Sequence, residues 1–400
     1  MEHYIFYCKL SLLAVLSLIT ACCMLSRRWY VNLAAFLACL SGETFLAHLF
    51  FPGYMLCPAA ASFIILFLSR IWDLSRTPAK GNGADPIRLP VRSGIRESRL
   101  EFYYHYSNFL VYGGAGSGKT KSIGKWLLSE YMRLGFAGFI YDFKDTDYTR
   151  TAYNLIKRHR YPHKFYYVSF DRPERSYRFN PLKVVRDRTE LIQLMEDVLL
   201  ALLPKKEQQN EWVAGGLGIL RGVAFRFWDE FPEHCTLPHI LAFIMTASAR
   251  QLSLFLQQNL VSEMLAGAYL KAEGSEKTQA SYLSTLCNNL ATISQNEEIA
   301  YVLSGDDFDF NLIDPETPKL FAVSNNFSEN SVYAPVISML MTISARQFSM
   351  QNRIPFVYFL DEMTTVNIKN FETLPSVLRE YKAAFILLTQ SGAKLENLYG

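Results

Sequence analysis

The segment VYGGAGSGKTKS, at residues 111–122, restricts the fold of this chain more than any other. Gly113, Gly118, Lys119 and Thr120 satisfy the spacing G-x-x-x-x-G-K-[ST] of a phosphate-binding loop. In such a loop, backbone amides and the N-terminus of the following helix hold phosphate oxygens, the lysine reaches the β- and γ-phosphates, and the hydroxyl binds Mg²⁺. The sequence therefore predicts a site for ATP and Mg²⁺, with these nucleotide-binding residues: Gly113, Gly114, Ala115, Gly116, Ser117, Gly118, Lys119 and Thr120.

Short apolar runs rich in β-branched and aromatic residues predict buried strands on both sides of this loop. Helical patterns lie between most of these runs, including one at 119–134 directly after the loop. Alternating strands and helices are typical of a doubly wound α/β fold with a parallel sheet. The predicted strands lie at 108–114, 136–143, 164–170, 319–326, 355–362 and 383–391.

The interval 186–303 is too long to be a simple crossover between two parallel strands. Its apolar residues recur at spacings of three and four, which predicts amphipathic helices, and strand signals are few. We therefore expect an all-α domain at 186–303, inserted into a nucleotide-binding domain formed by 101–185 and 304–400.

Polar residues at the ends of two later strands predict the rest of the nucleotide site. Asp361 and Glu362 follow the apolar run FVYFL, and ligands of parallel α/β sheets bind at such carboxyl ends. We expect Asp361 to hold Mg²⁺ through water and Glu362 to act as the general base for the attacking water. Gln390 ends the next strand, where its amide can contact the γ-phosphate or the lytic water.

Two further residues are weaker candidates for the site. Asp142 ends the strand at 136–143, beside Lys144, and both are weighed evenly between the site and the surface. Arg379 lies on the helical segment before the last strand, from which it could project into the site of a neighbouring subunit. The alternative is an ordinary solvated arginine on a helix.

The first 72 residues are predicted to lie in a membrane. Apolar segments at 4–25, 29–51 and 54–71 are each long enough, or nearly so, to cross a hydrocarbon core of about 30 Å. Basic residues follow the first and the last of them, which predicts three spans with the nucleotide loop in the cytoplasm. Two spans are the alternative, because the middle segment contains Glu43 and His48. Residues 73–100 are rich in Pro, Gly and charge, and predict a linker.

The ordered set of motifs resembles the coupling-protein ATPases of conjugation and type IV secretion, the TraG/TraD-like family. The resemblance rests on GGAGSGKT, IYDFKD, RFNPL, the long helical insertion, YFLDEM and the ending TQSGAKLENLYG. It implies a RecA-like P-loop domain, a hexameric ring and a multi-pass anchor in the bacterial inner membrane, with the ATPase domain in the cytoplasm. It also implies catalytic roles for Glu362, Gln390 and Arg379, since Arg379 stands eleven residues before Gln390, the spacing of the family's trans-acting arginine.

The family resemblance also implies the partners: a relaxase, single-stranded DNA, the inner-membrane components of a type IV secretion channel, and membrane lipid. Two features depart from the family pattern. The stretch after the acidic pair reads MTTVNIKNF, without the usual glycine. The chain also stops a few residues into the helix after the last strand, where the family's fold continues with further strands, so we expect either truncation after Gly400 or a sheet that is incomplete at one edge. Three alternatives stay open: an FtsK-like duplex-DNA pump, a coupling protein for effector proteins, and a non-catalytic receptor that binds nucleotide only to assemble.

Overall fold

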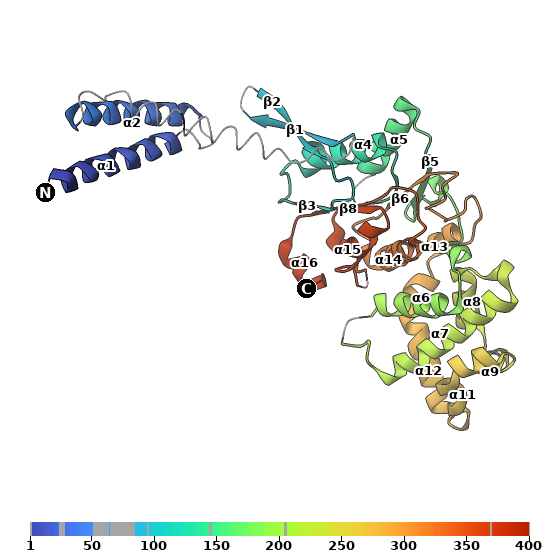
Figure 1. Ribbon diagram of the computed structural model, residues 1–400. Coiled ribbons are helices and arrows are strands. Elements are labelled where there is room, and N and C mark those ends of the chain that lie inside the picture. The colour runs from blue at the N-terminus through green and yellow to red at the C-terminus, as the bar shows by residue number, and fades with distance from the viewer. Residues whose placement is uncertain are drawn as a thin grey trace. The chain divides into compact units, whose positions relative to one another are not determined.

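The computed structural model describes residues 2–23, 29–50, 64, 85–93, 96–143, 146–203, 206–368 and 370–399. It divides into two units, Met1–Ala84 and Asp85–Gly400 (Figure 1). The first unit contains two helices, α1 (Glu2–Cys23) and α2 (Trp29–Phe50). They contact each other, and Lys9 Nζ lies 5.3 Å from the centre of the Phe50 ring.

These two helices occupy the first two of the expected membrane segments. Within the ranges that the structure describes, however, no helix combines the length and the apolarity needed to cross a membrane. The third expected segment, 54–71, lies outside the described residues apart from Ile64.

The second unit begins with a β-hairpin where the composition predicts a linker. Strands β1 (Ile87–Ser93) and β2 (Arg96–Phe102) pair antiparallel, with Leu89 opposite Leu100. In β1, the apolar residues Ile87, Leu89 and Val91 alternate with charged residues and a proline, which is the period of a strand. The charges and prolines of the whole segment instead predict a linker. Of the expected linker, 73–84 lies outside the described residues.

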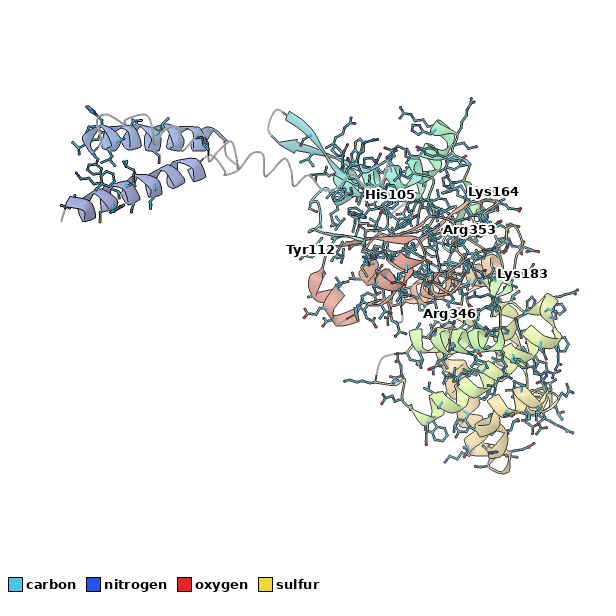
Figure 2. All side chains as sticks on the ribbon, in the orientation of Figure 1. His105, Tyr112, Lys164, Lys183, Arg346 and Arg353 are labelled. Carbon is cyan, nitrogen blue, oxygen red and sulfur yellow. The ribbon has the colours of Figure 1, made fainter. Side chains whose placement is uncertain are left out.

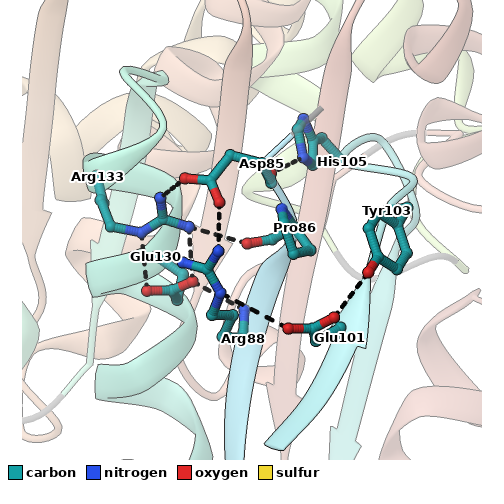
Figure 3. A network of polar contacts seen from close by, with 8 residues as sticks. All are labelled: Asp85, Pro86, Arg88, Glu101, Tyr103, His105, Glu130 and Arg133. Carbon is teal, nitrogen blue, oxygen red and sulfur yellow. Dashed lines mark hydrogen bonds and ion pairs between the residues drawn. The ribbon is translucent and has the colours of Figure 1, made fainter. Parts of the chain in front are cut away.

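A polar network holds the hairpin against the helix that follows the phosphate loop (Figure 3). The Arg88 backbone N–H donates to Glu130 Oε2 at 2.8 Å, and Arg133 donates to the Pro86 carbonyl at 2.9 Å. Arg133 also pairs with Asp85, and this hydrogen bond lowers the pKa of the Asp85 carboxyl. The start of the second unit is thereby fixed to the body of the sheet domain.

A six-stranded parallel sheet forms the centre of the second unit and confirms the predicted α/β class. Its spatial order is β3-β8-β7-β4-β6-β5. All its paired neighbours run parallel, so the carboxyl ends of its strands meet at one edge. The strands are β3 (Phe109–Tyr112), β4 (Ala137–Asp142), β5 (Lys164–Ser169), β6 (Lys319–Ser324), β7 (Phe356–Leu360) and β8 (Ala383–Thr389).

Helices cover both faces of the inner strands of this sheet, which explains why β4, β6, β7 and β8 are buried almost throughout rather than in alternation. On one face, Ile140 and Phe359 join a core with α4 (Lys125–Arg133) and α5 (Asp147–His159). On the other face, Phe139 and Tyr358 join a core with α14 (Asn330–Arg346). The remaining helices of the sheet domain are α15 (Leu374–Glu380) and α16 (Gly392–Tyr399), with short helical turns η3 (Pro173–Arg175), η4 (Pro181–Val184) and η7 (Met363–Thr365).

Between β5 and β6 the chain forms a group of helices centred on α7 (Glu211–Glu230). Around it lie α6 (Arg188–Ala201), α8 (Leu237–Thr246), α9 (Ala249–Gln257), α10 (Leu260–Leu265), α11 (Gly267–Lys271), α12 (Glu276–Ser294) and α13 (Glu297–Leu303), with short turns η5 (Pro232–His234) and η6 (Ala272–Gly274). We call these helices the helical insertion. Arg346 and Lys183 lie where it joins the sheet (Figure 2), and Arg346 pairs with Asp197 of α6 at 2.8 Å.

Candidate functional site

A cavity of about 630 Å³ opens at the carboxyl edge of the sheet. It is enclosed by the phosphate-loop segment, the ends of β7 and β8 and the first turn of α5. The lining residues are Ala115, Gly116, Ser117, Gly118, Lys119, Thr120, Lys121, Asp147, Tyr148, Arg150, Asp361, Glu362 and Gln390.

The glycine loop has the backbone conformation that its sequence predicts. Gly116 and Gly118 have φ angles of 73° and 83°, in the left-handed region that side chains rarely adopt. Gly113 donates its N–H to the Thr389 carbonyl at 3.3 Å, which ties the loop to the end of β8. A Cβ on Gly113 would lie 2.7 Å from Ser117 Oγ, so this position admits only glycine without rearrangement. Gly113 and Gly114 are therefore part of the loop, although neither lines the cavity.

Lys119 lines the cavity but is held by the loop itself. Its ammonium group donates to the carbonyl of Gly113, and to that of Gly114 at 3.1 Å. Directly after it, residues Thr120–Gly124 form a wide, π-helical turn (η2), and α4 continues to Arg133. The predicted helix at 119–134 thus starts in an irregular geometry, which is frequent at functional sites.

The acidic pair lies at the end of β7, in the same cavity. The Asp361 N–H donates to the Tyr141 carbonyl at 2.9 Å, which fixes the end of β7 to β4. Glu362 has φ 48° and ψ 52°, a strained conformation for a residue with a side chain. Thr365 supports it by donating both its N–H (2.9 Å) and its hydroxyl (2.7 Å) to the Glu362 carbonyl.

The Glu362 side chain has unused hydrogen-bonding capacity. The residue is only 8% exposed, and its Oε1 has no hydrogen-bond partner among the described residues. A buried carboxylate oxygen without a partner is costly in a folded protein. Its position in the wall of a cavity therefore suits a group that accepts a proton or a hydrogen bond from a ligand or water.

Asp142, a nucleotide-binding candidate weighed evenly between the site and the surface, lies at neither: it is buried and does not line the cavity. It is fully buried beneath the first turn of α5, where its Oδ2 accepts hydrogen bonds from the Thr149 N–H and hydroxyl, both at 2.8 Å. Burial raises the pKa of the Asp142 carboxyl to about 6, although these hydrogen bonds act in the opposite direction. Its role here is to hold α5, and Lys144 lies outside the described residues.

Gln390 and Arg379 have different positions. Gln390 follows β8 and lines the cavity together with Asp361 and Glu362. Arg379 is exposed on α15 and does not line the cavity of its own chain. The structure thus brings the glutamine, but not the arginine, to the loop and the acidic pair.

Sequence reasoning missed four residues of the wall: Lys121, Asp147, Tyr148 and Arg150. Three of them belong to α5, which starts at the same sheet edge because it follows β4 directly. The order of strand, turn and helix was available from the sequence. Only the strand order of the sheet, which places β4 next to β7, shows that α5 reaches this cavity.

The chemistry of the site suits Mg²⁺. Thr120 and Asp361 offer a hydroxyl and a carboxylate at one cavity, and both are hard oxygen donors. In the described part of the chain, no cluster of three or more His, Cys, Asp or Glu side chains could hold a metal by itself. Mg²⁺ commonly binds through one or two protein groups, waters and the phosphates of a substrate, so this sparse donor set fits it.

Comparison with known proteins gives a consistent result. A family profile described as the type IV secretion-system coupling protein DNA-binding domain matches residues 100–400. Among solved structures, the bacterial conjugative coupling protein TrwBdeltaN70 in complex with sulphate is 16% identical, with a TM-score of 0.59 over 83% of this chain and 72% of that one. No curated protein sequence matches.

Two further structures of TrwB have the same fold. The complex of the plasmid coupling protein with the ATP analogue ADPNP is 16% identical, with a TM-score of 0.59 over 83% of this chain and 73% of that one. The complex with ADP and Mg²⁺ is 15% identical, with a TM-score of 0.59 over 83% and 72%. At these identities the likeness establishes a shared fold.

Proposed function

This chain belongs to the family of type IV secretion-system coupling proteins, and from that premise we propose that it is an ATPase that drives substrate transfer. One observation carries the proposal: a phosphate loop, an acidic pair and a glutamine line a single cavity. The fold shared with TrwB, a protein solved with ADPNP and with ADP and Mg²⁺, supports ATP as the ligand.

The residues of the cavity divide the work as follows. The loop amides and Lys119 bind the β- and γ-phosphates, and Lys119 must leave the carbonyls of Gly113 and Gly114 to do so. Thr120 and Asp361 would hold Mg²⁺, which neutralises phosphate charge when bound. The Glu362 carboxylate accepts a proton from the attacking water, and Gln390 orients that water.

The remaining parts of the proposal concern the assembly. Arg379 is exposed and does not line the cavity of its own chain, so we propose that it reaches the site of a neighbour in a ring, a homohexamer by resemblance. The family description supports DNA as a partner. We propose that the cargo is a relaxase bound to single-stranded DNA, delivered to the inner-membrane components of the secretion channel.

The same premise gives the location. We propose that the apolar segments within residues 1–72 anchor the chain in the bacterial inner membrane and that the sheet domain lies in the cytoplasm. Fractionation of cells expressing the full chain, with and without residues 1–72, tests this placement. Recovery of the full chain in the soluble fraction would contradict it.

The central test is ATP hydrolysis by the purified full chain in detergent, with and without single-stranded DNA. Lys119→Ala is expected to lower hydrolysis about 100-fold or more, because it removes a cation from the phosphates. Glu362→Gln is expected to retain ATP binding and lose about 10²–10⁴-fold in rate. Lys277→Ala, an exposed residue of α12, is the matched control and should behave as the wild type. Hydrolysis that survives both site substitutions would refute the proposal.

A further inference from the structure

The first turn of α5 forms a wall of the nucleotide cavity that the phosphate loop and the acidic pair do not account for. Asp147, Tyr148 and Arg150 of this turn line the cavity. Asp147 and Arg150 are three residues apart, so they share one face of the helix.

Three consecutive side chains fix this turn to three different parts of the fold. The Asp147 carboxylate pairs with Lys125 of α4 at 2.8 Å. The buried Tyr148 ring lies 4.5 Å from that of Phe359 in β7, and its hydroxyl fills the space beside Gly124. Thr149 donates two hydrogen bonds to the fully buried Asp142 at the end of β4, as described above. The turn is therefore rigidly placed.

Arg150, the next residue, is the exception. Its side chain is exposed and makes no ion pair or hydrogen bond with the residues that the structure describes, although its backbone N–H donates to Thr146 at 2.8 Å. A guanidinium group held at a cavity wall by a fixed backbone, without a protein partner, is suited to an anionic ligand. Its planar fork matches a phosphate in two parallel hydrogen bonds.

The strand order indicates the side from which Arg150 reaches the cavity. β4, which leads into α5, is the neighbour of β7, which carries Asp361 and Glu362. β3, which leads into the phosphate loop, lies on the other side of β7, beyond β8. Arg150 thus approaches the cavity from the side of the acidic pair, where the terminal phosphate and the attacking water lie if the proposed function holds.

We propose that Arg150 is a further catalytic residue that contacts the terminal phosphate of ATP from within the same chain, with Asp142 and Thr149 as its positioning pair. The inference rests on the proposed function. Arg150 would supply a cation from the same chain, whereas Arg379 is proposed to supply one from a neighbouring chain. Charge that develops on the transferring phosphoryl group is thereby stabilised from two directions.

Equilibrium binding of ADPNP and ADP to the full chain, together with ATP turnover, tests the assignment. Arg150→Ala is expected to weaken ADPNP binding about tenfold, to change ADP binding less than twofold, and to lower kcat about 10- to 100-fold. Arg150→Lys should recover part of the loss, since it keeps the charge but not the fork. Arg158→Ala, in the last turn of the same helix and exposed, is the matched control.

The positioning pair needs its own readout. Thr149→Val removes one of the two hydrogen bonds to Asp142 and keeps the side-chain shape, and we expect a three- to tenfold loss of preference for ADPNP over ADP. Thr149→Ser should restore the preference. A purely structural role for Thr149 would instead lower the melting temperature and leave the ratio of the two dissociation constants unchanged.

The outcomes separate the two proposals. Wild-type chain that binds neither nucleotide refutes the proposed function itself. Alternatively, the wild type binds and hydrolyses ATP while Arg150→Ala leaves both the nucleotide preference and the turnover unchanged. That result overturns the inference about Arg150 alone. Equal weakening of ADPNP and ADP also overturns it, because the contact would then be to a phosphate that both ligands share.

Discussion

The nucleotide cavity and the helical insertion differ in how fully their buried polar side chains are bonded. In and beneath the cavity, Glu362 Oε1 and Asp142 Oδ1 are buried without hydrogen-bond partners, and Glu362 has a left-handed backbone. In the insertion, the buried Arg226 is bonded to the Phe255 carbonyl, to Gln258 at 3.0 Å and to Glu230 at 3.0 Å. Among the described residues of the insertion, Arg221 Nε is buried without a hydrogen-bond partner, but the same guanidinium group pairs with Glu196 at 2.6 Å. Unpartnered groups and strained backbone persist only where the surrounding structure enforces them.

Helix ends in the two regions differ in which residues cap them. The side chains of the residues that precede six helices of the insertion accept hydrogen bonds from backbone N–H groups of the first turn: Asp187, Asn210, Thr236, Ser248, Asn259 and Asn296. In α5, which lines the cavity, the preceding residue Thr146 is left-handed and makes no such cap, and the Thr149 N–H of the first turn donates instead to Asp142 at the end of β4. Six helices of the insertion are thus capped by the residue that precedes them, α11 and α12 of the insertion are not, and the first turn of α5 depends on a carboxylate at the end of β4.

The first prediction separates stability from activity at one residue. Glu362→Gly should lower ATP turnover about 10²–10⁴-fold, because the general base is lost. The free energy of unfolding should rise by about 1 kcal/mol, because glycine adopts the left-handed conformation without strain and the unpartnered buried oxygen disappears. Denaturant titration and a turnover assay measure both. A variant that loses stability would show that the acidic pair is not strained in the way that its backbone indicates.

The second prediction concerns the packing around α7. A Cβ on Gly218 would lie 2.7 Å from the Leu265 carbonyl oxygen, so Gly218→Ala should force α7 and α10 apart and cost about 2 kcal/mol of unfolding free energy. Gly267→Ala is the matched control, because nothing lies within 4 Å of its Cβ position. ADP binding should survive the Gly218 substitution while the chain is folded. Equal stability of the two variants would contradict the close packing.

Asp142 provides a prediction for pH dependence. Its folded pKa of about 6 lies above the ordinary value of 3.8, so the folded state binds the proton more tightly between these values. The free energy of unfolding should therefore fall as pH rises from 4 to 6, and then level off. Asp142→Asn removes this dependence while keeping an acceptor for Thr149. Relative to the wild type, the unfolding free energy of this variant should be higher at pH 7 than at pH 4 by on the order of 2 kcal/mol, measured by denaturant unfolding.

The smallest expected effect belongs to a helix cap in the insertion. Ser248 and Gln251 form a reciprocal capping box at the start of α9. Ser248→Ala should cost about 1 kcal/mol and increase hydrogen exchange in the first turn of α9. Ser284→Ala, an exposed position inside α12, is the control and should be neutral or slightly stabilising. A change in ATP turnover for Ser248→Ala would show that the two regions are coupled more tightly than we infer.

Much of the sheet and of the phosphate loop could be predicted from the sequence, because both depend on local patterns. The apolar runs gave the six strands of the parallel sheet, and glycine and lysine spacing gave the loop. The β1–β2 hairpin was missed because Pro90 and its charged neighbours resemble a linker, while the alternation of Ile87, Leu89 and Val91 is short. Within the expected all-α domain, extended backbone at Ala247 and Ser248 separates α8 from α9.

The sequence alone determined the phosphate loop, the parallel sheet class and the residues at strand ends, because each follows from the conformational preferences of a few consecutive residues. The tertiary structure decided which of these residues share a cavity. It placed Asp142 beneath α5 rather than in the wall, and it brought Arg150 to the wall without a sequence motif. The reason is that the order of strands in a sheet depends on long-range pairing, such as that of β4 with β7, which no local pattern encodes.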